Sequence, residues 1–415
     1  MPPFIADFHI HSPFSRATSK DLSFETLFAH GKRKGVSLIG TGDCTHPGWI
    51  AEIQKKLAPD GQGFFKLKSE KEATALLPLP PNAPDKIRFV LTGEISCIYS
   101  YGGKTRKVHC VVMMPDLDSV LRLNQRLAAI GNIKSDGRPI LGLDARNLLE
   151  IVLECSPEGV MIPAHIWTPW FSVLGSKSGF DSIEECFRDL TNHIFALETG
   201  LSSDPAMNWQ VSSLDRFALV SNSDAHSPSK IGREANLFNC DMSWPSVMDA
   251  LKGIDKKGFS GTVEFFPEEG KYHADGHRDC KISFLPEETR RHKGLCPVCG
   301  RGLTLGVLYR VEELKDRSAG IKPERAKPYF SFFSLKQLIG QLEECGPESK
   351  KVNKRYEEVL FRLGPELTIL LSIPLAEIDH QCGQELSQAI GLMRTGKVSA
   401  IPGFDGEFGK ITLGK

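Results

Sequence analysis

The sequence predicts an α/β protein whose barrel-like N-terminal domain is followed by a small zinc-binding module and an α-helical C-terminal domain. Three observations support this fold class. Short apolar runs alternate with helical stretches up to about residue 265, a Cys/His cluster comes next, and helical periodicity prevails from about residue 334. With 415 residues and 40% hydrophobic content, the chain can bury the core of two or three domains.

Seven apolar runs are the predicted strands of the first domain. In chain order they are FIADFHI, VSLIGTGD, IRFVLTGEI, VHCVVMM, GVMIPAH, IFALETG and FALVSNSDAH. Their alternation with helical or loop segments favours parallel pairing, and seven such strands indicate a barrel. One of the connecting helices is expected at 23–34, where Phe24, Leu27 and Phe28 recur at helical spacing and Gly35 can end the helix.

Composition divides the chain into three expected domains, with bounds 1–265, 266–317 and 318–415. The second domain holds the Cys/His cluster and is expected to be ribbon-like. The third begins with the linker SAGIKPERAKPYF, and its expected helices are SLKQLIGQLEEC, KVNKRYEEVLFRLG and QELSQAIGLMRTG. The chain closes with the Gly/Pro-rich segment IPGFDGEFG.

Charge and apolar runs limit the function classes. Lys plus Arg and Asp plus Glu balance at 51 each, so net charge neither predicts nor excludes nucleic-acid binding. Between residues 271 and 327, thirteen basic residues face eight acidic ones, which favours a basic surface around the Cys/His cluster. The sequence has no 18-residue apolar run and no signal-peptide pattern, so we expect a cytoplasmic, nucleoid-associated protein without membrane contact.

Polar residues that suit metal ions stand where the predicted strands end. His9 and His11, two residues apart, share one face, and Asp224 and His226 form a second such pair. Either pair alone could be hydrogen-bonded structural residues. Further candidates at other strand ends make that explanation poorer, and the full set is His9, His11, Asp43, Glu94, His109, His165, Asp224 and His226.

These ligands favour two or three divalent ions, such as Zn²⁺, Mn²⁺ or Mg²⁺. A bridged pair of ions suits phosphate chemistry, because one activates water while the other holds phosphate oxygens. We assign one ion to His9, His11, Glu94 and Asp224, a second to Glu94, His109 and His165, and a third to Asp43 and His226. The predicted catalytic residues are Asp224, Glu94 and His226. Glu198 could orient a ligand imidazole, and a buried ion pair is its alternative.

A second cluster has the spacing of a structural zinc site. His277 and Cys280 are separated by two residues, as are Cys296 and Cys299, and fifteen residues lie between the two pairs. Four N and S ligands in this arrangement predict one tetrahedral, structural Zn²⁺ whose binding is coupled to folding. A redox Cys-x-x-Cys is the alternative function, and His273 is an alternative ligand to His277.

The order of the metal-ligand motifs resembles the PHP (polymerase and histidinol phosphatase) domain. The resemblance runs roughly from residue 7 to residue 264 and implies a distorted, TIM-like barrel of seven parallel strands. One departure bears on the third ion. Cys44 follows Asp43, where trinuclear PHP phosphatases usually have His.

Together with the Cys/His cluster and the tail, the chain resembles the endonuclease Q family. The shared stretches are ADFHIHS, GTGD, PAHIWTPWFS, ETGLSSDPAMNW, SNSDAHSP, CPVCG and IPGFDGEFGKI. The resemblance implies a DNA repair endonuclease that cuts 5′ to deaminated bases such as uracil, hypoxanthine and xanthine, and at abasic sites. The archaeal form has four Cys in its ribbon, and His277 stands for one of them here.

An enzyme that recognises a damaged base in duplex DNA has to extrude the nucleotide into a pocket. Aromatic walls, base-edge contacts and phosphate contacts are therefore expected near the metal ligands. The residues that we assign are Trp167, Trp170 and Phe171 for the walls, Asp204 and Asn208 for base edges, and Arg16, Lys20 and Lys177 for phosphates. The aromatic residues could instead only cap the barrel, and the basic residues could be solvated.

Two other functions fit part of the pattern. A small-molecule phosphatase acting on a substrate such as histidinol phosphate needs the metal ligands but neither the Cys/His cluster nor the tail. A non-catalytic DNA-binding accessory protein needs no complete ligand set. The expected partner is damaged DNA, double- or single-stranded, and a sliding clamp or another repair protein is a possible further partner.

Overall fold

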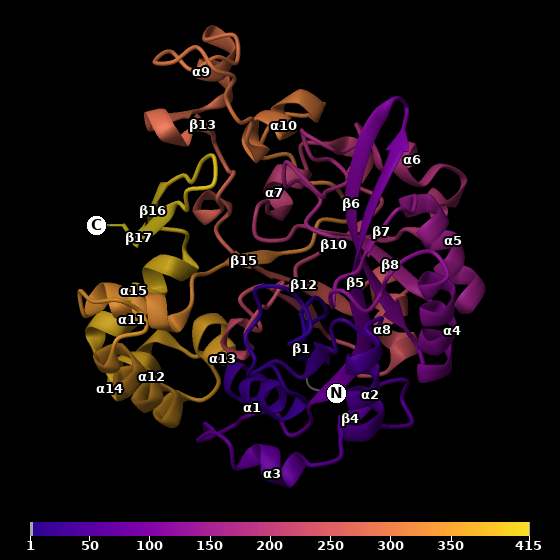
Figure 1. Ribbon diagram of the computed structural model, residues 1–415. Coiled ribbons are helices and arrows are strands. Elements are labelled where there is room, and N and C mark those ends of the chain that lie inside the picture. Colours follow the sequence, from indigo (N-terminus) through magenta and orange to yellow (C-terminus); the bar gives the residue numbers. More distant parts are fainter. Residues whose placement is uncertain (1–2, 415) are drawn as a thin grey trace.

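The computed structural model describes residues 3–414, and all seven predicted apolar runs form strands in it (Figure 1). The strands are β1 (Phe4–Asp7), β2 (Leu38–Gly40), β5 (Arg88–Tyr101), β6 (Lys104–Met114), β8 (Val160–Pro163), β9 (Ala196–Glu198) and β10 (Ala218–Val220). This prediction is confirmed. Shorter strands beside β5 are β3 (Leu57–Pro59), β4 (Phe65–Leu67) and β7 (Ile140–Leu141).

The seven strands follow one another around a ring of hydrogen bonds. β1 pairs with β2, β2 with β5, β5 with β6, and β6 with β8, while β9 pairs with β10. The N–H of Ile166, just after β8, donates to the carbonyl of Glu198 in β9 at 3.0 Å. Ile10, beyond β1, forms a parallel bridge with Ala225, beyond β10, and so closes the ring.

The prediction of a wholly parallel ring is wrong at β6. The pairs β5–β6 and β6–β8 are antiparallel, while β1–β2, β2–β5 and β9–β10 are parallel. The cause is a two-residue turn between β5 and β6, where Gly102 and Gly103 have φ values of 60° and 73°. Positive φ at both central positions is the geometry that joins antiparallel strands directly, and glycine adopts it without steric cost.

The interior of the ring is filled by side chains from every one of its strands. One apolar cluster contains Ala6 from β1, Leu38 from β2, Val90 from β5, Val111 from β6, Ile162 from β8, Ala196 from β9 and Val220 from β10. A larger apolar cluster packs helices against the outside of the ring. The ring is therefore a packed core, and its ligand-bearing loops rest on a rigid base.

Helices surround the ring and cover it. They are α1 (Phe24–Lys34), α2 (Pro47–Lys56), α3 (Glu70–Thr74), α4 (Leu117–Ala128), α5 (Ala145–Cys155), α6 (Ile183–Phe187), α7 (Pro205–Asn208) and α8 (Trp244–Lys252). The predicted first helix is confirmed. Ser23 caps the N-terminus of α1, and Gly35 ends the helix with a left-handed φ of 86°.

Three strands extend the sheet beyond β1. They are β11 (Ala235–Phe238), β12 (Phe259–Glu264) and β15 (Tyr329–Ser331). β11 pairs antiparallel with both β1 and β12, and β15 pairs parallel with β12. The segment expected to be a linker thus contributes a strand to the N-terminal sheet, so the third domain is not wholly helical.

The Cys/His module projects from the ring, at the upper left of Figure 1, and contacts its loops through Arg310, whose Nε–H donates to the carbonyl of Leu174 at 3.0 Å. Its elements are β13 (Asp275–His277), β14 (Ile282–Phe284), α9 (Pro286–Arg291) and α10 (Val307–Leu314). The C-terminal hairpin of β16 (Val398–Ile401) and β17 (Lys410–Leu413) lies beside it. The N–H of Ala274 donates to the carbonyl of Gly403 at 2.9 Å, and the N–H of Arg278 donates to Asp405 at 2.7 Å.

The remaining C-terminal chain is helical, as expected. Its helices are α11 (Leu335–Leu342), α12 (Lys350–Leu363), α13 (Glu366–Leu371), α14 (Leu375–Cys382) and α15 (Gln384–Arg394). The three helices expected from sequence correspond to α11, α12 and α15. Across residues 3–414, no helix is both long enough and apolar enough to cross a membrane. The expected domain bounds stay predictions.

Candidate metal centre

Four predicted ligands form the first ligand group, which consists of His9, His11, Glu94 and Asp224. His9 and His11 follow β1, Glu94 lies in β5, and Asp224 follows β10. Nε2 of His11 lies 2.9 Å from Oδ1 of Asp224, and Nε2 of each histidine lies 3.3 Å from Oε2 of Glu94. His9, His11 and Asp224 lie just beyond the ends of their strands, as expected, whereas Glu94 lies in the middle of β5 and not at its end.

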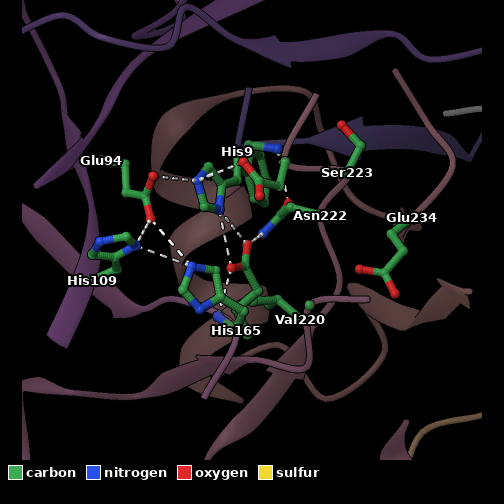
Figure 2. Close-up of polar contacts among 12 residues, drawn as sticks. His9, Glu94, His109, His165, Val220, Asn222, Ser223 and Glu234 are labelled. Carbon is green, nitrogen blue, oxygen red and sulfur yellow. Dashed lines mark hydrogen bonds and ion pairs between the residues drawn. The ribbon is translucent and has the colours of Figure 1, made fainter. Parts of the chain in front are cut away.

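Glu94 also belongs to a second ligand group, with His109 and His165 (Figure 2). Its other oxygen, Oε1, lies 2.7 Å from Nδ1 of His109 and 3.3 Å from Nε2 of His165. One carboxylate oxygen thus faces each group. This is the arrangement that a carboxylate bridging two ions requires.

His9 and His11 are each held by a carboxylate from another part of the chain. Nδ1 of His9 lies 3.0 Å from both oxygens of Glu198, and Nδ1 of His11 lies 3.1 Å from Oδ1 of Asp43. Glu198 in turn accepts hydrogen bonds from the side chain of Asn222 and from the N–H of His165. A carboxylate behind a ligand imidazole fixes its orientation and increases its basicity.

His109 and His165 are held by hydroxyl groups instead. Nε2 of His109 lies 3.1 Å from Oγ of Ser96, and Nδ1 of His165 lies 3.1 Å from Oγ of Ser172. All four imidazoles therefore have one nitrogen engaged by a positioning side chain. The other nitrogen is turned toward Glu94.

The residues assigned to a third ion belong to neither ligand group. Oδ2 of Asp43 accepts hydrogen bonds from the N–H of Ser12 at 2.7 Å, its hydroxyl at 2.6 Å and the hydroxyl of Ser15 at 2.8 Å. With Oδ1 beside His11, both oxygens of Asp43 are engaged in positioning the first loop. His226 lies beside His11 with ring centroids 4.5 Å apart and ring planes tilted by 56°, and its side chain is about one-third exposed. A third ion stays a prediction.

Opposite charges within the cluster offset the effect of burial on the pKa values of its members. Burial alone would lower the pKa of His9 and His11, but neighbouring carboxylates hold it well above the usual value. Burial would likewise raise the pKa of Glu94, but His109, Arg138 and His9 hold it well below its usual range. His109 behaves differently, since burial dominates and lowers its pKa to about 4.

These residues fit metal ions by their chemistry and by one unpaired atom. Nε2 of His9 is buried and points into the first ligand group, where it lies 3.3 Å from Oε2 of Glu94 but makes no hydrogen bond with any described residue. A buried polar atom without a partner is costly unless something else satisfies it. Imidazole nitrogens and carboxylate oxygens are ligands of Zn²⁺ and Mn²⁺, so an ion between them explains the atom.

Backbone strain coincides with the predicted ligands. Asp43, His165 and Asp224 have φ values of 44°, 30° and 47°. Non-glycine residues rarely adopt such conformations, and their persistence indicates that the surroundings impose them. The strain places these side chains against their partners.

Two residues assigned to the base pocket lie in the core, which corrects that expectation. Trp167 is fully buried, and its Nε1–H donates to Oδ1 of Asn208 at 2.8 Å. Asn208 is fully buried too, and its amide donates to Ser203 and to the carbonyl of Asp204. Asp204 caps the N-terminus of α7. Their hydrogen bonds are used within the fold, so these residues brace the loops and present no edge to a base.

The other aromatic candidates are more accessible. Trp170 is 37% exposed and packs edge-on against Tyr272 of the Cys/His module, with ring centroids 5.4 Å apart. Phe171 is half-buried, and its ring lies 4.7 Å from that of His109. No sequence pattern pointed to Tyr272. Trp170 and Tyr272 thus form an aromatic surface between the metal ligands and the module.

The basic candidates are all exposed. Arg16 pairs with Asp136 at 3.2 Å, and its side chain is 79% exposed. Lys20 and Lys177 are exposed, and Lys177 lines a small polar pocket with Arg106. Their role as phosphate contacts stays a prediction.

The predicted zinc ligands converge into the Cys/His cluster, which consists of His277, Cys280, Cys296 and Cys299. Sγ of Cys299 lies 3.7 Å from Nδ1 of His277. His273, the alternative ligand, is not part of this group. The β13–β14 hairpin brings the first pair of ligands, and a turn from Cys296 to Arg301 brings the second.

Comparisons with known proteins extend over the whole chain. Residues 334–397 match the family model described as the MJ0043 C-terminal domain. The uncharacterized protein MJ0043 of Methanocaldococcus jannaschii is 32% identical over 252 residues, which are 60% of this chain and 31% of that protein. The lesion-specific endonuclease PfuEndoQ of Pyrococcus furiosus matches with a TM-score of 0.86 and 29% identity over 99% of this chain and 96% of that one.

A second solved structure gives the same result. Endonuclease Q in complex with a 27-mer duplex that carries an abasic lesion at the active site matches with a TM-score of 0.85 and 29% identity, over 100% of this chain and 97% of that one. The chain is a structural homologue of endonuclease Q. Because the likeness to endonuclease Q covers the full chain, it includes the ring, the Cys/His module and the helical region together.

Proposed function

We propose that the chain is a metal-dependent DNA repair endonuclease that hydrolyses the phosphodiester bond 5′ to deaminated bases and abasic sites. The observation that carries this proposal is the match over the full chain to endonuclease Q, combined with two ligand groups that share Glu94. The deaminated bases are uracil, hypoxanthine and xanthine. Damaged DNA, double- or single-stranded, is the proposed partner.

Two divalent ions are the proposed cofactors. His9, His11, Glu94 and Asp224 would hold one ion, and Glu94, His109 and His165 would hold the second. Bound there, the ions supply an activated water and positive charge for the phosphate. Zn²⁺, Mn²⁺ and Mg²⁺ are the candidates. A structural Zn²⁺ is proposed for the Cys/His cluster.

The protein side chains contribute orientation and exclusion of water. Glu198 and Asp43 fix the rings of His9 and His11 from behind, so no ligand has to reorganise when the phosphate arrives. Both histidines are buried, and Glu94 is about 1% exposed, whereas Asp224 is about one-quarter exposed. The DNA backbone therefore approaches from the side of Asp224.

The aromatic surface of Trp170 and Tyr272 is the proposed place for the extruded nucleotide. It replaces the buried Trp167 and Asn208 in that role, because only accessible ring faces stack on bases. The basic residues of the module would contact phosphates without reading sequence. A nucleotide held there would have its backbone beside the ligand groups.

The test is a cleavage assay on end-labelled duplexes that contain one uracil, hypoxanthine, xanthine or abasic site. With divalent metal, we expect one nick on the 5′ side of the lesion and a product that keeps its base. Undamaged duplex is the control for the DNA. Asp224→Asn is the control for the protein, and its nicking rate on lesion duplex should be lower by roughly 10³-fold. Release of free uracil would contradict the proposal, and activity on free phosphomonoesters alone would favour a small-molecule phosphatase.

A further inference from the structure

Arg138 is a basic side chain beside the candidate metal ligands, and no sequence motif includes it. Its Nη1–H donates to Oε2 of Glu94 at 3.0 Å. The same oxygen lies 3.3 Å from Nε2 of His9 and of His11. The guanidinium group therefore lies directly beside the first ligand group.

The backbone around Arg138 is fixed by close packing. Gly137 donates its N–H to the carbonyl of Phe14 at 3.0 Å, and a Cβ at this position would lie 2.2 Å from Oδ2 of Asp43. Only glycine permits so close an approach. On the other side, the carbonyl of Pro139 accepts a hydrogen bond from the N–H of Ser96 in β5. These contacts hold Arg138 at one position relative to the metal ligands.

A neighbouring ion pair adds to this rigidity. Oδ1 of Asp136 accepts the N–H of Arg138 at 3.1 Å, and Oδ2 of Asp136 lies 3.2 Å from Nε of Arg16. The segment 136–139 is therefore tied to both the first ligand loop and β5. An arginine needed only to neutralise a buried carboxylate does not require such a defined backbone.

The donors of Arg138 are mostly unused by the protein. A guanidinium group has five N–H donors, and among residues 3–414 its side chain makes one hydrogen bond, to Glu94. The Arg138 side chain is 29% exposed, whereas Glu94 is completely buried. Arg138 thus has one end on a metal ligand and free donors at the surface.

The exposed edge of the cluster is where a phosphate has to enter. Its members are Arg138, Asp224 and His226, with side-chain exposures of 29%, 23% and 33%. His9 and His11 are at most 1% exposed. Of the three residues at this edge, Arg138 carries a permanent positive charge and donors that match phosphate oxygens.

We propose that Arg138 donates hydrogen bonds to a non-bridging oxygen of the scissile phosphate and stabilises the charge that develops there during hydrolysis. The inference rests on the proposed function for its substrate, a DNA phosphodiester, and names a binding residue for it. Held by Glu94, Arg138 occupies this position before the substrate arrives, which avoids reorganisation in the transition state.

The first test compares Arg138→Met and Arg138→Lys with Arg126→Met. Arg126 lies on α4, is exposed and pairs with Glu154, so it is a matched surface control. We expect kcat/KM on abasic-site duplex to fall by about 10²-fold for Met and less for Lys, mainly in kcat, because a transition-state donor is lost. Metal content per chain should be unchanged. Loss of metal, or unchanged kcat, overturns the inference.

A sulfur substitution locates the contact. The two phosphorothioate diastereomers at the scissile position each replace one non-bridging oxygen. If Arg138 contacts one of these oxygens, the penalty for that diastereomer disappears in Arg138→Met but remains in Arg126→Met. Additive effects of sulfur and Arg138→Met for both diastereomers contradict the contact, because independent groups do not couple.

Binding of inorganic phosphate to the metal-loaded protein tests Arg138 without DNA. Calorimetry should show about 10-fold weaker phosphate binding in Arg138→Met than in wild type or Arg126→Met, since one charge-assisted hydrogen bond is lost. Equal affinities, or no binding by wild type, overturn the inference. Failure of the proposed function would appear differently, as intact lesion duplex with the wild type while the difference in phosphate affinity persists.

Discussion

The two ligand groups around Glu94 and the Cys/His cluster both bring candidate metal ligands together, but they differ in how the ligands are held in place. The six ligands around Glu94 come from five segments spread between residues 9 and 224, are mostly buried, and are positioned by Glu198, Asp43, Ser96 and Ser172. The Cys/His ligands come from two turns within residues 277–299, and Cys299 is exposed. The ligands around Glu94 are positioned by the rest of the fold. The Cys/His module, by contrast, is expected to need its ion in order to fold.

The surroundings of the Cys/His cluster support the proposal that the module needs an ion in order to fold. Leu285, Leu295 and Val298 are 54%, 48% and 68% exposed, so few apolar side chains stabilise this module. The ring, by contrast, has side chains from all seven strands in its interior. Metal binding supplies the missing stability in small modules of this type.

The largest effect is expected from Glu94→Gln, which removes the carboxylate shared by both ligand groups. Nicking of lesion duplex should fall by about 10³-fold or more, because both ions lose a charged ligand. Glu94 pairs with Val111 through its backbone, which the substitution leaves unchanged, so the main thermal transition should persist. Circular dichroism and metal analysis measure the two effects, and global unfolding of this variant would contradict the contrast between the two sites.

Cys296→Ser should instead unfold the Cys/His module and leave the ring folded. One zinc per chain should be lost, and residues 285–303 should become sensitive to protease while the ring keeps its thermal transition. Affinity for DNA should fall by about 100-fold at moderate salt, because phosphate contacts from the module are lost. Cys382→Ser, on a half-buried cysteine of α14, is the control. Full zinc content in Cys296→Ser would exclude the assigned ligand.

The affinity of the first ligand group for metal is expected to depend on pH. The pKa of His9 and of His11 is well above 6.5 in the metal-free protein, so both carry a proton near neutral pH. A metal requires neutral imidazole, and affinity should therefore rise with pH, by up to about 100-fold per unit when two protons are displaced. The rise should continue until the pH passes the raised pKa values. Competition with a chelator at pH 6, 7 and 8 measures it, and constant affinity would contradict it.

The smallest effect in this series is expected from Glu198→Gln. The amide loses the charge that orients His9, and metal affinity or activity should fall by about 10- to 100-fold. Glu150→Gln on α5, an exposed carboxylate paired with Arg146, is the control and should match wild type. An unchanged Glu198→Gln protein would show that the hydrogen bond to His9 does not position the metal ligand.

Sequence predicted the parts of this site that depend on local pattern. Strand positions, α1 and the convergence of His9 with Glu94 follow from apolar runs that end in ligand residues. The direction of β6 depends on the turn at Gly102 and Gly103, which the alternation of apolar runs does not reveal. Trp167 was placed at the surface because adjacency to His165 says nothing about which neighbour is buried.

Arg138 could not be identified from sequence for a different reason. It lies in a loop without apolar periodicity, and its partner Glu94 is 44 residues away. Only the approach of Gly137 to Asp43 in three dimensions brings it to the ligands. Contacts between loops depend on the packing of the elements that carry them, which pattern alone does not give.

Because β5 and β6 form one hairpin, Glu94 and His109 of the second ligand group are expected to come together early in folding. Glu94 and His109 are separated by a single tight turn, so their half of the site can form from local chain within microseconds, before the ring closes through Ile10 and Ala225. The register pairs Ser96 with His109. If one residue inserted into this turn shifted the register of β6 by one position, His109 would turn to the opposite face and leave the second ligand group. The same shift would turn Val111 out of the ring interior, so the register that packs the core is also the register that brings His109 to Glu94.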